Sequence, residues 1–297
     1  MYDLIILGTG PSGLSAAVYA ARYKMNFLCI GAIPGGTITQ AHQIENYPGI
    51  ESVTGIELGK RMEEHAKKLG AEIVADSIKK IEKKDDHFIL HGNKEYEAKR
   101  ILLAIGAERA KLKIKGEEEF LGKGVSYCAT CDGPFFKDKI VCVVGGGNAA
   151  VTSALYMAEL SKKVYLIYRG EELKAEPAWI EQLKNQKNAE IIYNSNVTEI
   201  QGKERVDKVI LDTNREIELD GIFIEIGSTP SKALVANLGL KTDERGYIKV
   251  DSEMKTDAEG IWAAGDVAYD HFKLRQAVTA AAEGALAIYS AYLDTKK

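Results

Sequence analysis

The sequence contains few cysteines, no long apolar run and no excess of basic charge. Cysteine occupies only 4 of 297 positions, too few for the disulfide framework of a small secreted protein. The apolar runs, of which 101–104 is typical, fall far short of the ~20 residues that a membrane helix needs. The net charge is −4, so we expect neither nucleic acid nor an anionic membrane surface as a partner.

The start of the chain shows no signal-peptide pattern. No basic segment and no cleavage site precede the strand-like stretch 2–7, and we therefore expect the protein in the reducing cytoplasm. Apolar residues make up 45% of the chain and charged residues 28%, which is ordinary for a globular protein that buries real cores. The length suits about two domains.

A first glycine turn opens the chain. Gly8, Gly10 and Gly13 have the spacing G-x-G-x-x-G, after the apolar run Leu4–Leu7 and before an alanine-rich helical stretch at 14–23. Glycine at these positions permits a tight turn and lets a pyrophosphate approach the backbone at the helix N-terminus. The pattern predicts a nucleotide site, and the alternative is a tight turn without a ligand. The acidic residue expected about 20 residues later for a ribose hydroxyl is missing, because Gly31 stands there.

A second glycine turn follows near the middle of the chain. Gly145, Gly147 and Ala150 have the spacing G-x-G-x-x-A, between a predicted strand at 139–144 and a predicted helix at 148–160. Arg169 ends the next predicted strand, and Lys174 lies five residues later. A cation there favours the 2′-phosphate of NADP over the free hydroxyl of NAD. Glu171 and Glu172 would oppose a phosphate, so NADPH is predicted and NADH stays open.

A C-x-x-C pair lies between the two turns. Cys128 and Cys131 are spaced so that they can close a disulfide, and such a pair beside βαβ units predicts a redox site. Asp132 is adjacent and suited to give or take a proton. A structural zinc site needs four ligands, but the sequence has no second C-x-x-C and no histidine near this pair. The alternative is a pair of unreactive structural thiols; Cys29 and Cys142, in apolar strands, are expected in the core.

The two halves of the chain have the same βαβ pattern. The charged segment 107–123 is predicted as a solvated domain crossing, and the tail after Gly246 has a strand at 261–264 and a closing helix at 274–292. That tail is too short to fold alone, so we expect it to return to the first domain. The predicted fold is α/β, with two Rossmann-like three-layer domains, the second inserted into the first. The predicted ranges are 1–110 and 244–297 for the first domain and 111–243 for the second.

Seven stretches together carry a family resemblance. They are Gly8-Thr9-Gly10-Pro11-Ser12-Gly13, Gly35-Gly36, Glu45-Asn46-Tyr47-Pro48-Gly49, Cys128-Ala129-Thr130-Cys131-Asp132-Gly133, Gly145-Gly146-Gly147-Asn148, Ala264-Gly265-Asp266 and Arg275-Gln276-Ala277. With these motifs the chain resembles the low-molecular-weight thioredoxin reductase family over nearly its whole length.

The resemblance implies an enzyme that passes a hydride from NAD(P)H to FAD, then reduces the disulfide of Cys128 and Cys131, then reduces a thioredoxin or glutaredoxin-like protein. It implies that Cys131 faces the flavin, that Cys128 attacks the partner's disulfide and that Asp132 is the acid–base group. It also implies a homodimer. The lack of further ligands near Cys128 and Cys131 predicts no metal. The implied FAD residues are Gly8, Gly10, Pro11, Ser12, Gly13, Gly35, Gly36, Thr37, Asn46, Gly106, Gly265, Asp266, Arg275, Gln276 and Ala277. The implied NAD(P)H residues are Gly145, Gly147, Asn148, Ala149, Ala150, Arg169, Lys174 and Gly227.

The chain departs from the family pattern at four places. Thr37 stands where glutamine is common, Ile105 where threonine is usual and Thr152 where an acidic residue is usual. The fourth departure is the 2′-phosphate site, where Tyr168-Arg169-Gly170 replaces His-Arg-Arg and Lys174 replaces a further arginine. One cation is lost and one is changed from a planar fork to a point charge.

Three alternatives to the NAD(P)H-driven relay stay open. A reduced ferredoxin or a deazaflavin is an alternative electron donor, and oxygen is an alternative acceptor. A nucleotide-binding redox sensor without turnover is a third interpretation. Because the dithiol and the nicotinamide site share one domain, we expect the relay to need a rotation between domains at crossings near 107–111 and 240–246.

Overall fold

The computed structural model describes residues 1–41, 43–230, 234–269 and 274–296. The chain forms two compact units. The first unit comprises Met1–Thr39, Gln43–Glu108 and Thr229–Lys297, and the second comprises Gln40–His42 and Arg109–Ser228. The sequence predicts domain boundaries at 110/111 and 243/244. These remain predictions, because compact units are not shown to be independent domains.

The first unit contains a parallel five-stranded sheet with the order β18-β7-β1-β2-β3. Its strands are β1 (Leu4–Leu7), β2 (Phe27–Ile30), β3 (Ile73–Val74), β7 (Ile101–Leu103) and β18 (Ile261–Ala263). β18 pairs with β7 although it comes from the end of the chain. The C-terminal tail therefore returns to the first sheet, as the sequence predicted.

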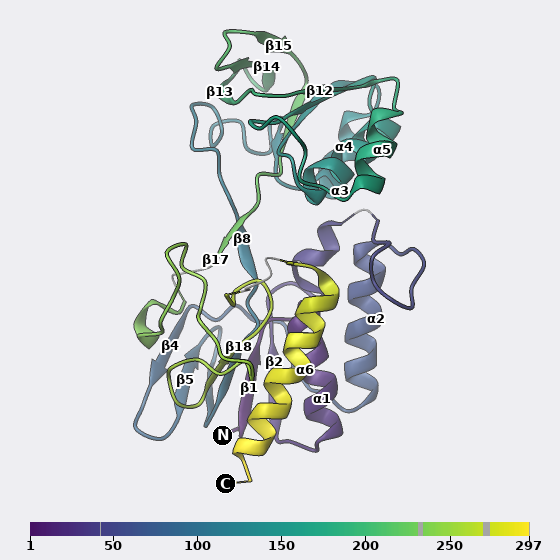
Figure 1. The fold of residues 1–297 in the computed structure, drawn as a ribbon. Helices are drawn as coiled ribbons and strands as arrows, with labels where there is room; N and C mark the ends of the chain where they lie inside the picture. Colours follow the sequence, from purple (N-terminus) through teal and green to yellow (C-terminus); the bar gives the residue numbers. More distant parts are fainter. Residues whose placement is uncertain (42, 231–233, 270–273, 297) are drawn as a thin grey trace. The chain divides into compact units, whose positions relative to one another are not determined.

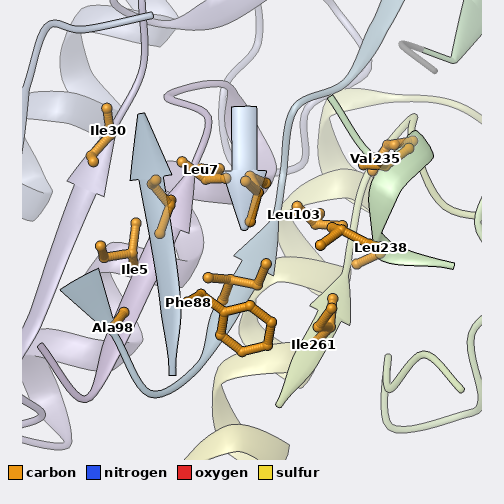
Figure 2. Packing of buried hydrophobic residues seen from close by; sticks show 14 of the residues in the cluster. Ile5, Leu7, Ile30, Phe88, Ala98, Leu103, Val235, Leu238 and Ile261 are labelled. Atoms are coloured by element: carbon orange, nitrogen blue, oxygen red, sulfur yellow. The ribbon is translucent and has the colours of Figure 1, made fainter. Parts of the chain in front are cut away.

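Both faces of this sheet are covered. Ile5 and Leu7 belong to a core cluster shared with an antiparallel sheet of β4 (Lys80–Lys83), β5 (Phe88–His91) and β6 (Glu95–Ala98). Figure 2 shows Ile5, Leu7 and Leu103 near Phe88 in this cluster. Leu4 and Ile6 belong to a second cluster, shared with α1 (Pro11–Arg22), α2 (Gly55–Lys68) and α6 (Ala277–Asp294). Successive side chains of a strand point to opposite faces, which explains why every residue of β1 is apolar and buried.

The second unit repeats this plan. Its parallel sheet has the order β12-β11-β10-β16-β9, from β9 (Val125–Ser126), β10 (Ile140–Val144), β11 (Lys163–Ile167), β12 (Ala189–Ile192) and β16 (Gly221–Ile224). One face packs on α4 (Asn148–Leu160), and the other on the antiparallel sheet of β13 (Val197–Gly202), β14 (Val206–Leu211) and β15 (Glu216–Glu218). In both units a glycine turn follows the central strand, β1 or β10. The α/β, three-layer prediction is confirmed for both units (Figure 1).

The remaining elements are short or lie at the unit boundaries. They are η1 (Gly36–Gln40), β8 (Ala107–Arg109), α3 (Ala129–Asp132), η2 (Gly133–Phe136), α5 (Pro177–Lys184), β17 (Ser228–Pro230) and η3 (Ala236–Leu238). β8 pairs with β17, where the chain leaves the first unit and returns to it. No helix in the described parts of the chain is long and apolar enough to cross a membrane.

Two sequence-based expectations were wrong in detail. The patterns of 206–213 and 216–226 predict two paired strands, but the second stretch is two strands, β15 and β16, because the chain changes from the antiparallel to the parallel sheet between them. The acidic run at 117–119 was predicted as solvated, but Glu117 is 1% exposed. Its carboxylate accepts hydrogen bonds from the backbone N–H groups of Leu112 and Lys113 and from the Tyr127 hydroxyl. Glu117 is therefore a buried side chain that holds this segment together.

Candidate redox and dinucleotide sites

The two cysteines of the C-x-x-C pair form a disulfide. Cys128 and Cys131 are bonded, with 5.3 Å between their Cα atoms. Cys128 is the N-cap residue of α3, and Ala129 on that helix is buried in the core cluster below α4. The packing of α3 is tight, because a Cβ on Gly133 would lie 2.9 Å from the Tyr156 ring. The disulfide is therefore carried on a turn anchored to the second unit's core.

The two sulfur atoms have different surroundings. The backbone N–H of Cys131 donates a hydrogen bond to Sγ of Cys128 over 3.2 Å. A hydrogen bond donated to sulfur favours the thiolate once the disulfide opens, so Cys128 is suited to be the nucleophile. Cys128 is 9% exposed, whereas Cys131 is exposed. Exposure alone favours Cys131 as the sulfur that contacts a partner's disulfide. The roles of the two thiols therefore remain predictions.

Asp132 lies beside the pair and is partly buried. Its Oδ2 atom accepts a hydrogen bond from the hydroxyl of Ser126 over 2.6 Å. The same hydroxyl accepts a hydrogen bond from the N–H of Cys128 over 3.0 Å. Sequence reasoning did not identify Ser126; the only available signal was its position at a strand end two residues before the first cysteine.

The other two cysteines are core residues, as predicted. Cys29 and Cys142 are free thiols and fully buried. Burial raises the pKa of Cys29 to about 12 and raises that of Cys142 as well, because the apolar interior disfavours a thiolate. Neither is suited to redox chemistry at neutral pH.

The glycines of the first turn have separate physical roles. Gly8 has φ +116°, and a Cβ there would lie 2.1 Å from the carbonyl oxygen of Ala104. A Cβ on Gly13 would lie 1.9 Å from the carbonyl oxygen of Gly8. A Cβ on Gly10, in contrast, would meet nothing closer than 3.9 Å. The outer glycines are therefore needed for folding, and Gly10 leaves space beside the N-terminus of α1.

The surroundings of the first turn fit a large polar ligand. Gly36 packs against Gly10, because a Cβ on Gly36 would lie 2.7 Å from the Gly10 Cα. Oγ of Ser12 is buried and has no hydrogen-bond partner in the described parts of the chain. Gly265, after β18, approaches Ser12 closely, since a Cβ there would lie 3.0 Å from the Ser12 Cβ. Gly106, after β7, has φ +65° and open space around it.

The start of α6 brings further polar groups to this unit. Nε and Nη2 of Arg275 are buried and have no hydrogen-bond partner among the residues that the structure describes. The Arg275 guanidinium lies over the ring of Tyr247, 3.9 Å from its centroid. Asn46 donates a hydrogen bond to the side chain of Gln276 over 3.1 Å, across 230 residues of sequence. Unpaired buried donors are costly, so Arg275 and Ser12 together fit a dinucleotide such as a flavin nucleotide.

The remaining FAD residues implied by the resemblance lie on these segments. Pro11 is the first residue of α1 and Ala277 the first of α6, Gly35 is buried, Thr37 is exposed on η1, and Asp266 follows Gly265. Gly8, Gly106 and Gly265 follow β1, β7 and β18, so the carboxyl ends of these parallel strands bring them to one edge of the sheet.

The second glycine turn repeats the geometry of the first. Gly145 has φ +145°, and a Cβ there would lie 2.2 Å from the carbonyl oxygen of Glu225. A Cβ on Gly147 would meet nothing within 4 Å. Ala150, at the third position, is buried against Gly145. Gly227 lies just after β16 with open space around it, and Ala149 is exposed.

A loop after β11 folds back onto this turn. Asn148 donates to the carboxylate of Glu176 over 2.9 Å and accepts from its N–H over 2.7 Å. The N–H of Lys174 donates to the carbonyl oxygen of Gly146 over 2.6 Å. The ring of Tyr168 covers Gly146, where a Cβ would lie 2.4 Å from it. The loop therefore holds the strand end and the turn together.

The two predicted cations stand on this loop. Arg169 and Lys174 are both exposed, and neither forms an ion pair with any residue in the described ranges. Glu171 and Glu172 are exposed on the same loop. The structure thus places two unpaired cations and two carboxylates on one short segment.

A buried ion pair near the second turn was also missed by sequence reasoning. Glu225 is 6% exposed and accepts a hydrogen bond from Arg109. Ser153 on α4 donates to the other carboxylate oxygen over 3.3 Å. In the parts of the chain that the structure describes, no three His, Cys, Asp or Glu side chains gather where they could hold a metal ion.

Two open glycine turns on parallel sheets, with a disulfide on one unit, are the features of a nucleotide-dependent disulfide oxidoreductase. A family model described as pyridine nucleotide-disulphide oxidoreductase matches residues 2–284. The chain belongs to this family, and it is therefore an oxidoreductase that uses a flavin and a nicotinamide cofactor.

Curated relatives and solved structures carry more specific names. The thioredoxin reductase of Bacillus subtilis is 42% identical, over 98% of this chain and 93% of its own length. The crystal structure of Lactococcus lactis thioredoxin reductase matches with a TM-score of 0.94 and 37% identity, over 99% of this chain and 98% of that one. A ferredoxin-flavin thioredoxin reductase from Clostridium acetobutylicum matches with a TM-score of 0.55 and 35% identity, over 99% of this chain and 98% of that one.

Proposed function

We propose that this chain is a thioredoxin-disulfide reductase. The net reaction is NAD(P)H + H⁺ + partner disulfide → NAD(P)⁺ + partner dithiol. The observation that carries the proposal is the closed Cys128–Cys131 disulfide with a backbone donor on Sγ of Cys128. It is supported by the names of the relatives that this chain resembles over almost its whole length.

We assign FAD to the first unit and NAD(P)H to the second. The open Gly10 and the unpaired Ser12 and Arg275 support a flavin dinucleotide in the first unit. When bound, FAD supplies a two-electron carrier between nicotinamide and disulfide. In the second unit, Gly147 and the backbone N–H groups at the start of α4 would hold a diphosphate. Arg169 and Lys174 would meet the 2′-phosphate of NADPH.

The thiol chemistry belongs to three residues. Once the disulfide is reduced, the Cys128 thiolate attacks one sulfur of the partner's disulfide and forms a mixed disulfide. The partner's departing thiolate takes a proton, and we assign the supply of that proton to Asp132. The Cys131 thiolate then attacks Sγ of Cys128. This restores the disulfide and releases the partner's second thiolate, which takes a proton from solvent. Two electrons and two protons have then passed to the partner.

The surface beside the disulfide supports a protein partner. Phe135, four residues after Cys131, is 76% exposed, and large exposed aromatic residues are common at interfaces. We therefore assign a thioredoxin-like or glutaredoxin-like protein as the acceptor. A homodimer in the cytoplasm is our expectation for the assembly and its compartment; sedimentation of the purified protein tests the first part.

The decisive experiment reduces the oxidised flavoprotein without oxygen, using NADPH or NADH separately, and follows flavin bleaching. Fast bleaching by either nucleotide, followed by reduction of a thioredoxin's disulfide, is the expected result. Bleaching by NADPH alone means that Arg169 and Lys174 suffice for the phosphate. Bleaching by NADH alone means that the lost arginine has reversed the preference.

A ferredoxin-driven reductase is the second candidate. It is favoured by the relative named for ferredoxin and flavin and by the missing cation at Gly170. If neither nucleotide bleaches the bound flavin but a reduced ferredoxin does, the dithiol relay remains and the donor assignment is wrong.

A further inference from the structure

Ser126 is a buried hydroxyl at the centre of the dithiol turn. It is the last residue of β9 and is 4% exposed. It is paired in register with Phe223 of β16, in the parallel sheet of the second unit, so its backbone is held by that sheet. Its Oγ lies 2.6 Å from Oδ2 of Asp132, 3.0 Å from the N of Cys128 and 3.3 Å from the carbonyl O of Cys128.

The directions of these hydrogen bonds follow from the groups involved. The hydroxyl of Ser126 has one proton and two lone pairs. The N–H of Cys128 is a donor and takes a lone pair. Two acceptors compete for the single proton, and the carboxylate of Asp132 is both closer and charged, which makes the stronger bond. Ser126 therefore donates to Asp132 and joins that carboxylate to the backbone of the first cysteine.

We propose that Ser126 is the positioning residue for Asp132 in the thiol–disulfide reaction. It binds Oδ2, while Oδ1 accepts no hydrogen bond from the residues that the structure describes. Oδ1 is then the atom that exchanges a proton with the departing thiolate. This inference rests on the proposed function, because it assumes that Asp132 is the acid–base group.

Removal of the hydroxyl has a specific consequence. A hydrogen bond donated to a carboxylate favours its charged form. Ser126→Ala removes that bond, so the pH limb of the reaction that depends on Asp132 should move upward in this variant.

The test measures single-turnover reduction of a thioredoxin's disulfide by the pre-reduced holoenzyme between pH 5 and 9. Asp132→Asn identifies the limb by removing it. Ser126→Ala should shift that limb upward, and Ser126→Thr, which keeps the hydroxyl, should leave it near its wild-type position. In the Asp132→Asn background, Ser126→Ala should cause no further change in the pH profile, since its effect passes through the carboxylate. Flavin reduction by the electron donor reports the fold of each variant.

Several outcomes would overturn the inference. One is a limb that stays in place in Ser126→Ala; another is an equal shift in Ser126→Thr and Ser126→Ala. If Ser126→Ala does not fold, the isosteric pair Ser126→Thr and Ser126→Val gives the same comparison. If Asp132→Asn removes no limb, Asp132 is not the acid–base group and Ser126 has nothing to position. If wild type reduces no thioredoxin at any pH, the proposed function itself has failed.

Discussion

The carboxylate of Glu225 and the guanidinium of Arg109 form an ion pair beside the second glycine turn. The Glu225 side chain is 3% exposed, and that of Arg109 is 29% exposed. Burial raises the pKa of Glu225, while the charge of Arg109 and the hydrogen bonds from Ser153 and Arg109 lower it, and burial is the larger effect. The carbonyl oxygen of Glu225 also lies against Gly145. The pair therefore lies at the edge of the sheet that carries the second glycine turn.

Replacement of this carboxylate tests the balance between burial and pairing. Glu225→Ala leaves Arg109 without its charged partner, with only Gln40 accepting its hydrogen bonds, and should destabilise the protein by about 2–3 kcal/mol at pH 7. This is less than the ~3–5 kcal/mol of a fully buried pair, because Arg109 is partly exposed. Thermal unfolding of the holoenzyme measures the change. The exposed Glu218→Gln is the control and should lie within about 0.5 kcal/mol of wild type.

The pH dependence of Glu225→Gln has a definite sign. The folded state raises the pKa of Glu225 above its ordinary value of 4.5. The stability that it contributes is fully present below pH 4.5 and is lost as pH rises through the folded pKa. Glutamine stays neutral, so the melting temperature of Glu225→Gln minus that of wild type should increase from pH 4.5 towards neutrality. A difference that falls over this range would contradict the dominance of burial.

Single cysteine variants separate the steps of the relay. Cys128→Ser should keep flavin reduction by the donor and lower reduction of the partner below about 1% of wild type. Cys131→Ser leaves the attacking thiolate without its resolving partner, so a mixed disulfide between Cys128 and the partner should accumulate. Mass spectrometry of the non-reduced complex measures it. Accumulation in Cys128→Ser instead would reverse the two roles, in the direction that the exposure of Cys131 favours.

The two glycine positions of the second turn predict opposite phenotypes. Gly147→Ala meets open space in an extended backbone, so stability should stay within about 0.5 kcal/mol. Its methyl group would stand where a diphosphate approaches, and nicotinamide affinity should fall by about 10-fold or more. Gly145→Ala would clash with the Glu225 carbonyl and should destabilise by about 2 kcal/mol or more. Calorimetric titration measures the nicotinamide affinity, and thermal unfolding measures the stability. A loss of stability in Gly147→Ala would contradict the different roles of the two glycines.

We expect the two loop cations, Arg169 and Lys174, to set the preference between NADPH and NADH. Arg169→Ala or Lys174→Ala should raise the KM for NADPH by about 10-fold each, the size of one charge-assisted hydrogen bond. The KM for NADH should change less than about threefold, because NADH has no 2′-phosphate. The exposed Lys162→Ala is the matched control for general charge. Equal changes in the KM for NADPH and for NADH would mean that these side chains do not bind the 2′-phosphate.

Local patterns predicted much of the fold and of the site. β1, β10 and the two helices after them were predicted because buried parallel strands are apolar throughout and are followed here by glycine turns. Apolar residues at helical spacing predict a helix over 54–69, and in the structure Thr54 and Leu69 are the cap residues of α2. The same spacing places Ile56 on the apolar side of that helix, yet Ile56 is 59% exposed. Helical spacing predicts which side of a helix is apolar, but the elements packed against the helix decide which residues on that side are buried.

The sequence by itself determined the features that depend on chain neighbours: the glycine spacings, the C-x-x-C pair and the order of strands and helices. Tertiary structure alone decided which distant groups meet. Ser126 reaches Asp132 because β9 ends in the parallel sheet of the second unit. Arg109 pairs with Glu225 across 116 residues of sequence, and Asn46 meets Gln276 across 230 residues. Hydrogen bonds and ion pairs act over a few ångströms in space, and no local pattern records which remote residues folding brings within that range.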